Sequence, residues 1–244
     1  MATQTSSPKN SVANNENLLP LNGRLAWHGS APRAVAKAGD WLDESKGWEA
    51  WLEHLLNRSH PKPLGQVLPG KGTPLGWCAE EVGISSQTDE RLDVLDRLTR
   101  GKPVSATVLD AAVDDFLAGD DVSAAGALES IAWCHALGPL AQRTRAETWW
   151  ELLGRLLQRC CDADQIDLDQ SPLEHQLLAG ELRLAMSYQL PEMKTTRSLV
   201  TPARRALSEG PDTLLDGEGL PHASRLHLMR PLLACWTRCV AMGQ

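Results

Sequence analysis

Residues 144–190 read TRAETWWELLGRLLQRCCDADQIDLDQSPLEHQLLAGELRLAMSYQL, and this stretch decides the fold class. Leucine, tryptophan and alanine recur at helical spacing on both sides of the acidic segment DADQIDLDQ. TRAE and SPLE match the capping box that starts a helix, and Pro172 suits the first helical position. Two helices, 144–161 and 172–190, are therefore predicted, joined by an exposed acidic link.

The flanking sequence repeats this helical pattern. Ser105–Leu117 and Val122–Leu137 are expected to form a helical pair joined by AGDD. Gly119 is suited to stop the first helix, and Asp121 to cap the second. Near the C-terminus, five apolar residues spaced 3, 4, 3 and 4 positions apart share one helical face. They are Leu226, Met229, Leu233, Trp236 and Val240. The chain is predicted to be all-α, built from antiparallel helical hairpins.

Composition also favours helix over sheet. Leucine and alanine dominate the apolar residues, whereas the chain holds one Phe and one Tyr, so the aromatic and β-branched residues that suit strands are scarce. The nine tryptophans are unusual. Most are predicted to pack between helices, and stacking on a sugar is the alternative for the others.

The chain divides into a tail and one helical domain. Residues 1–20 are polar and aperiodic, which predicts a disordered tail. Residues 21–244 are expected to form a single helical domain. Within it, a loop rich in proline and glycine around 59–77 interrupts the helices and is typical of segments that cover a site.

Charge and hydropathy exclude some classes of partner. Lys and Arg total 24 against 31 Asp and Glu, a net charge of −7, which disfavours broad nucleic-acid binding. No stretch reaches the roughly 18 consecutive apolar residues of a membrane span, and the start lacks the pattern of a secretory signal. We therefore expect a cytoplasmic protein with no nucleic-acid or membrane partner.

The cysteines predict neither a metal site nor a redox centre. The six cysteines include no C-x-x-C pair, and a cytoplasmic protein keeps its thiols reduced. Glycine-rich nucleotide-binding motifs are also missing from the sequence. No metal and no cofactor are predicted.

The segment DTLLDGEGLPHASRLH, residues 212–227, is the first candidate for chemistry. Its glycines and proline fix a turn that presents Asp216, Glu218 and His222 before a helix. A carboxylate beside a histidine can tune it for acid–base work. The same residues also suit a plain turn and helix start, so both interpretations stay open.

Further candidates come from neighbouring helices. Tyr188, the sole tyrosine, can act as an acid or base or can pack between core and surface. Arginines suit the binding of carboxylate or sulfate groups, and Arg225 and Arg230 are the predicted anion contacts. The wider set that would line such a groove is Arg197, Arg204, Arg205, Arg225, Arg230 and Arg238. A solvated helical face is the alternative.

The segments WWELLGRLLQRC, LLAGELRLAMSYQLPE and LLDGEGLPHASRLHLMRPLLACWTRC together resemble the helical portion of heparinase II/III-like polysaccharide lyases. The resemblance covers Trp133 to the C-terminus. It implies an incomplete α/α toroid with a histidine after a glycine-rich turn at the cleft, which His222 matches by position.

The resemblance also implies a chemistry. Such lyases perform β-elimination, in which a tyrosine or histidine removes the proton α to a uronate carboxyl, and Tyr188 and His222 would take these roles. The chain has no residues for the β-sandwich domain that usually follows. A helical domain that cleaves or binds an anionic polysaccharide is therefore expected, and a non-enzymatic scaffold for a protein partner is the alternative.

Overall fold

The computed structural model describes residues 27–37, 45–68, 74–76 and 80–243. Within these ranges the chain is all-α, with no strand, which confirms the predicted class. The incomplete α/α toroid stays a prediction. The tail predicted for residues 1–20 lies outside the described residues, as does part of the loop predicted around 59–77. No helix in the described part is long and apolar enough to cross a bilayer.

The helical elements vary widely in length. The α-helices are α1 (Arg33–Lys37), α2 (Ser45–Asn57), α3 (Leu64–Val67), α4 (Ser86–Thr99), α5 (Ala106–Ala118), α6 (Ala124–Leu140), α7 (Ala146–Asp162), α8 (Pro172–His175), α9 (Arg183–Gln189), α10 (Lys194–Ser198), α11 (Val200–Leu214) and α12 (Met229–Gly243). The 3₁₀ elements are η2 (Glu80–Val82), η3 (Ala163–Gln165) and η5 (Ala223–Leu228), and η4 (Gln176–Leu182) is a π-helix.

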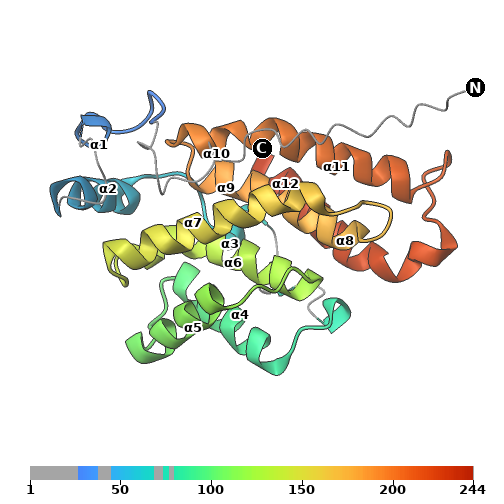
Figure 1. The fold of residues 1–244 in the computed structure, drawn as a ribbon, viewed down its shortest axis with the longest axis horizontal. Helices are drawn as coiled ribbons and strands as arrows, with labels where there is room; N and C mark the ends of the chain where they lie inside the picture. Colours follow the sequence, from blue (N-terminus) through green and yellow to red (C-terminus); the bar gives the residue numbers. More distant parts are fainter. Residues whose placement is uncertain (1–26, 38–44, 69–73, 77–79, 244) are drawn as a thin grey trace, which may run out of the picture.

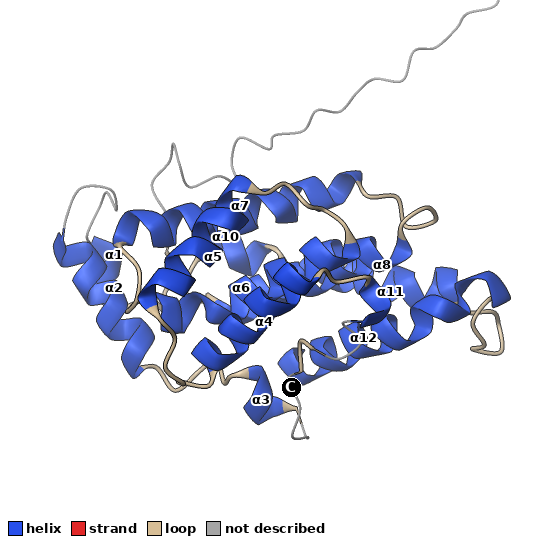
Figure 2. Cartoon of the chain, turned by 90° about the horizontal axis from the view of Figure 1, so that it is seen from below, coloured by secondary structure: helices blue, strands red, loops and turns tan. Residues whose placement is uncertain are grey.

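The helices lie in three tiers (Figure 1). α4 and α5 form one outer tier, α6 and α7 the middle, and α9 to α12 the other outer tier, with α1 and α2 at one end. α6 runs through the interior, as the second view also shows (Figure 2). Because each tier covers an apolar face of the next, the buried side chains form one cluster that extends from Val35 to Met242.

α6 is the central helix of this cluster. Its residues from 124 to 137 are all buried, because α4, α7, α9 and η4 pack around it. Its N-cap is Ser123, whose Oγ accepts the N–H of Gly126 at 3.3 Å. The prediction that Asp121 caps this helix is wrong. The Asp121 carboxylate instead accepts the N–H of Ser123 at 2.9 Å and so shapes the turn before the cap.

The pairing of helices differs from the prediction. The largest helix–helix contact joins α6 to α4, and α5 packs against α7, so the predicted pair of neighbours across AGDD is not the main pairing. The helical stretch from Pro172 to Gln189 runs through α8, η4 and α9, close to the predicted extent, and packs mainly on α11 and α6. Gly180 allows η4 to approach α11 closely, because a Cβ at this position would lie only 2.7 Å from Cδ2 of Leu207.

Tryptophans fill much of the core, as predicted for most of them. Trp51, Trp133 and Trp149 are fully buried. The rings of Trp149 and Trp150 meet edge to face with centroids 4.7 Å apart. The indole N–H of Trp149 donates to the carbonyl of Leu137 over 2.8 Å, so its polar atom is satisfied inside the core.

Candidate functional site

The glycine-rich turn after α11 is closed by its own backbone. The Asp216 carboxylate accepts the N–H groups of Glu218 and Leu220 at 2.9 Å each. The N–H of His222 donates to the carbonyl of Leu214 over 3.2 Å. These backbone bonds, first that from Leu220, lower the pKa of the Asp216 carboxyl. The structure thus brings Asp216, Glu218 and His222 together on one exposed turn, where Asp216 shapes the turn.

Tyr188 and the turn that holds His222 lie near opposite ends of α11. It stands at the C-terminal end of α9, beside the start of α11, whereas His222 follows the far end of α11 (Figure 1). The Tyr188 hydroxyl accepts the N–H of Lys62 at 3.1 Å and donates to its carbonyl at 3.0 Å. The two predicted acid–base residues are therefore not brought together, and the phenol holds the proline-rich segment in place.

The two arginines predicted to bind an anion, Arg225 and Arg230, already have partners within the chain. Arg225 donates to the backbone carbonyl of Asp169. Arg230 forms an ion pair with Glu81 of η2. Arg238, from the wider arginine set, is buried. These arginines hold elements of the fold together at separate places.

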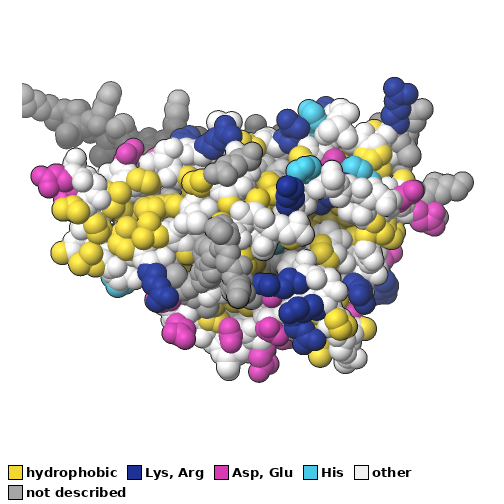
Figure 3. Space-filling view, turned by 180° about the vertical axis from the view of Figure 1, so that it is seen from behind, with side chains coloured by type: hydrophobic (Ala, Val, Ile, Leu, Met, Phe, Trp, Pro, Cys, Tyr) yellow, Lys and Arg dark blue, Asp and Glu magenta, His cyan; other side chains and the backbone are white. Residues whose placement is uncertain are grey.

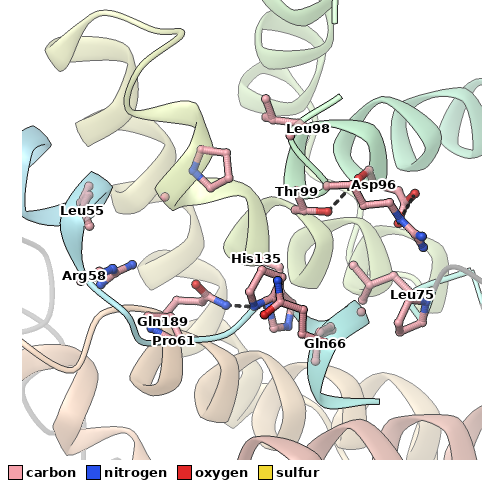
Figure 4. Close-up of a pocket in the computed structure, with 18 of the residues that line it drawn as sticks. Leu55, Arg58, Pro61, Gln66, Leu75, Asp96, Leu98, Thr99, His135 and Gln189 are labelled. Carbon is pink, nitrogen blue, oxygen red and sulfur yellow. Dashed lines mark hydrogen bonds and ion pairs between the residues drawn. The ribbon is translucent and has the colours of Figure 1, made fainter. Parts of the chain in front are cut away.

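A different part of the molecule is hollowed. A cavity of about 550 Å³ lies between the end of α2, the proline-rich residues 58–66 together with Pro74 and Leu75, the end of α4, α6 and Gln189 of α9 (Figure 4). Leucines and prolines form much of its wall, including Leu55, Leu98 and Pro61. Polar and charged side chains complete the wall, and the two buried ones among them are Gln189 and His135, 5% and 6% exposed.

His135 projects from α6 and is 6% exposed. The Nε2 amide of Gln189 lies 2.8 Å from His135 Nδ1. An amide nitrogen only donates, so Nδ1 accepts and the proton of the neutral ring is on Nε2. Burial, with a smaller effect from Arg238, lowers the pKa of His135 from 6.5 to about 3, so the ring is neutral at pH 7. Its Nε2–H has no hydrogen-bond partner among the described residues.

A proline interrupts the backbone hydrogen bonds of α6 at the same place. Pro139, in the last turn of α6, lines the cavity together with Gly138. A proline has no N–H, so the helical bond that residue 139 would give to the carbonyl of His135 is missing.

Arg58 supplies positive charge at the cavity. Its Nη1 lies 3.3 Å from both carboxylate oxygens of Glu192. One oxygen of the same carboxylate also lies 2.7 Å from Nε2 of His54. Burial lowers the pKa of Arg58 and outweighs the opposing effect of Glu192. Nε and Nη2 of Arg58 make no hydrogen bond with the described residues.

A second buried ion pair lies next to the cavity wall, which it contacts through Pro74. Arg238 of α12 binds both carboxylate oxygens of Glu181 in η4, at 2.5 and 2.8 Å, and its Nη1 donates to the carbonyl of Pro74, in the cavity wall, at 3.3 Å. Two thiols, Cys235 and Cys239, place ligand atoms within 4.8 Å of those of Glu181. Burial raises the pKa of the Cys235 thiol well above its usual range. The paired carboxylate and protonated thiol suit a structural core better than a metal ion.

Outside the loop around 59–77, the sequence reasoning missed the residues that line this cavity. A signal was present in AWCHALGP, residues 132–139, where one histidine interrupts an apolar helical run that ends in Gly-Pro. Arg58 and Gln189 gave no signal of their own.

In comparisons with known proteins, no family model matches the chain, and no curated protein and no solved structure match it either.

Proposed function

We propose that this chain is a ligand-binding helical domain and that the cavity at His135, Arg58 and Gln189 is its binding site. The observation that carries the proposal is the cavity itself, about 550 Å³ in volume, whose wall combines apolar side chains with His135, Arg58 and Gln189.

The size and lining of the cavity support a small ligand. Its volume of about 550 Å³ lies within the roughly 300–1,000 Å³ of small-molecule sites. Its wall offers both apolar contact and polar groups that can orient a ligand. The amides of Gln142 and Gln189, with Arg58, can exchange hydrogen bonds with hydroxyl groups. A sugar-sized, oxygen-rich compound therefore remains our proposal for the ligand.

The chemistry of the site favours binding over catalysis. A base with a pKa of about 3, as His135 has, is a weak proton acceptor at neutral pH. Burial raises the pKa of Tyr188, whose hydroxyl is already bonded to Lys62. β-Elimination by Tyr188 and His222 would need a substrate that spans opposite ends of α11. Carbohydrate binding is therefore the better-supported form of the expected function.

One observation favours the alternative, a scaffold for a protein partner. On the outer face of η5 and α12, Leu226, Leu233 and Val240 are 57%, 54% and 61% exposed. Figure 3 shows hydrophobic side chains gathered at the end of the molecule where η5 leads into α12. The predicted stripe is therefore divided: Met229 and Trp236 pack against the core, and these three residues face solvent. Such stripes are typical of helix-pairing surfaces.

A ligand screen on a matched pair of variants tests the proposal. Gly138 lines the cavity, and a Cβ there would meet only Nη2 of Arg58, at 3.7 Å. Gly138→Ala should fold and bind like the parent chain, whereas Gly138→Leu should fill the cavity. Ligand-observed NMR with neutral sugars, hydroxy acids, amino acids and nucleosides measures binding. We expect binding of at least one class that Gly138→Leu abolishes. If no compound binds in a Gly138-dependent way, the proposed site is wrong.

A further inference from the structure

Resting on the proposed function, we infer that the cavity binds an uncharged ligand: a neutral glycoside, with hydroxyl groups on one part and an apolar group on the other. The charged side chains of the wall are already balanced by opposite charges. The uncharged polar side chains of the wall are amides, which complement hydroxyl groups.

Each charged side chain of the cavity wall has an opposite charge beside it. Among the described residues, three charged side chains line the cavity, and they are Arg58, Asp96 and Arg100. Asp96 and Arg100 form an ion pair at 2.8 Å. Arg58 lies 3.3 Å from the buried carboxylate of Glu192. The wall and the residue that supports it thus combine two guanidinium groups with two carboxylates.

This balance disfavours a charged ligand. A carboxylate or an ammonium group that enters a partly enclosed site loses hydration, and the site must supply an uncompensated opposite charge to recover that cost. An anion would have to compete with Glu192 for Arg58 and would share the cavity with the Asp96 carboxylate. A cation would share it with the two guanidinium groups. A neutral ligand avoids both costs.

Glutamine amides complement the hydroxyl groups of such a ligand. Gln66 and Gln142 line the cavity, and their amides make no hydrogen bond with the described residues. The amide nitrogen of Gln189 is bonded to His135, whereas its oxygen is turned away from the ring and accepts no hydrogen bond in the described part of the chain (Figure 4). Because this oxygen is not one of the fully buried polar atoms without a partner, a ligand can reach it.

A hydroxyl group suits these amides because it donates and accepts through the same oxygen. It can therefore pair with the carbonyl or with the NH₂ group of a glutamine. The apolar part of the wall, which includes Leu55, Leu98 and Pro61, would cover the apolar group of the ligand and remove it from water. A neutral glycoside offers both kinds of surface without a charge.

Matched sugars that differ in charge test this inference. Phenyl β-glucoside and phenyl β-glucuronide share an aglycone and a ring, and they differ only in a hydroxymethyl group against a carboxylate. Glucose, glucuronate and glucosamine form a smaller set that adds a positive charge. Each is titrated into the full chain by calorimetry at about pH 6, where the carboxylate and the amine are charged. The neutral member of at least one set should bind about tenfold more tightly than its charged partners.

Charge variants show whether the ion pairs cause this selectivity. Glu192→Gln removes the carboxylate beside Arg58, and Asp96→Asn removes a carboxylate from the wall itself. Each should weaken the preference for the glucoside over the glucuronide several-fold. Asp93→Asn is the matched control, because Asp93 is exposed on the same helix as Asp96 and does not line the cavity. Thermal unfolding checks that the variants fold, and Asp96→Asn decides the test if Glu192→Gln does not.

The outcomes separate this inference from the proposed function. Equal or tighter binding of the glucuronide, or a preference that neither carboxylate variant changes, would overturn the assignment of an uncharged ligand and leave the cavity as a binding site. The same holds if no sugar binds while another compound binds in a Gly138-dependent way. Failure of every compound in both experiments would overturn the binding site itself.

Discussion

The Nε2 amide of Gln189 lies 2.8 Å from Nδ1 of His135 and fixes the tautomer of the buried ring. The amide donates to Nδ1, so the ring proton is on Nε2. One residue of α9 thus decides which ring nitrogen of a residue of α6 carries the proton. The same bond links two of the three tiers beside the cavity.

Gln189→Glu should reverse the tautomer. A carboxylate only accepts, so Nδ1 of His135 must become the protonated nitrogen and Nε2 an acceptor. Nitrogen-15 and carbon-13 NMR of the labelled imidazole distinguishes the two tautomers. The matched control is Gln142→Glu, because Gln142 lines the cavity but does not bond to the ring. An unchanged tautomer in Gln189→Glu would contradict the arrangement.

Protonation of His135 should make stability depend on pH. The unfolded chain takes up this proton near pH 6.5, whereas the folded chain does so only near pH 3. Between these values the unfolded state binds more protons, so the free energy of unfolding falls as the pH falls. The contribution is complete above pH 6.5 and changes by at most about 1.4 kcal/mol per pH unit within the window.

His135→Gln should flatten this dependence. Urea unfolding from pH 7 down to pH 4 measures it, since glutamine does not titrate. The exposed His222 provides the control variant His222→Gln, which should keep the slope of the parent chain. If the free energy of unfolding changes equally between pH 6.5 and 4 in His135→Gln and in the parent chain, His135 does not titrate as inferred.

The sequence was informative about helices because their period is local. Apolar spacing located the stretch from Pro172 to Gln189 nearly to its ends. Helix caps depend on finer geometry, and this is where predictions failed. Thr144, predicted to open a capping box, donates its hydroxyl to the carbonyl of Leu140, and Arg145 takes the N-cap position.

The cavity could not be predicted because it depends on pairing between distant segments. His135 and Gln189 are 54 residues apart and meet only because α9 packs on α6. Helical periodicity says which face of each helix is apolar, but it does not say which helix covers that face. The candidate residues near His222 were chosen by local composition, which in this turn reflects the hydrogen bonds of Asp216 with its own backbone.

Tyr188→Phe should loosen the proline-rich segment without unfolding the chain. The change removes two hydrogen bonds to the backbone of Lys62, which we expect to cost about 1–2 kcal/mol in the free energy of unfolding. The ring keeps its packing. Hydrogen exchange at the Lys62 amide should accelerate, whereas exchange in the interior of α6 should change only with global stability. Unaltered exchange at Lys62 would show that the phenol does not hold this segment.

The ion pair between Glu181 and Arg238 should show strong coupling. Both side chains are almost completely buried, so Arg238→Met leaves an uncompensated carboxylate and should cost about 3–5 kcal/mol. Glu181→Gln leaves an uncompensated guanidinium and should also be costly. The double variant, Glu181→Gln with Arg238→Met, should lose less than the sum of the two. Urea unfolding of the four chains measures the cycle, and additive losses would rule out the coupling.

The contact between η4 and α11 requires a glycine at position 180. A Cβ there would lie 2.7 Å from Cδ2 and 2.9 Å from Cγ of Leu207, so Gly180→Ala should destabilise the chain by about 1–3 kcal/mol through overpacking. Gly154 of α7 is the matched control, because nothing lies within 4 Å of its Cβ position. Gly154→Ala should instead stabilise by up to about 1 kcal/mol, since alanine favours helix.

A second background identifies the cause of the loss at Gly180. In a Leu207→Ala chain the colliding methyl groups are gone, so adding Gly180→Ala should cost little or become favourable. Thermal and urea unfolding of the single and double variants measure this cycle. If Gly180→Ala is as destabilising without the Leu207 side chain as with it, the penalty comes from the π-helical backbone of η4, and the close packing of α11 on Gly180 does not explain it.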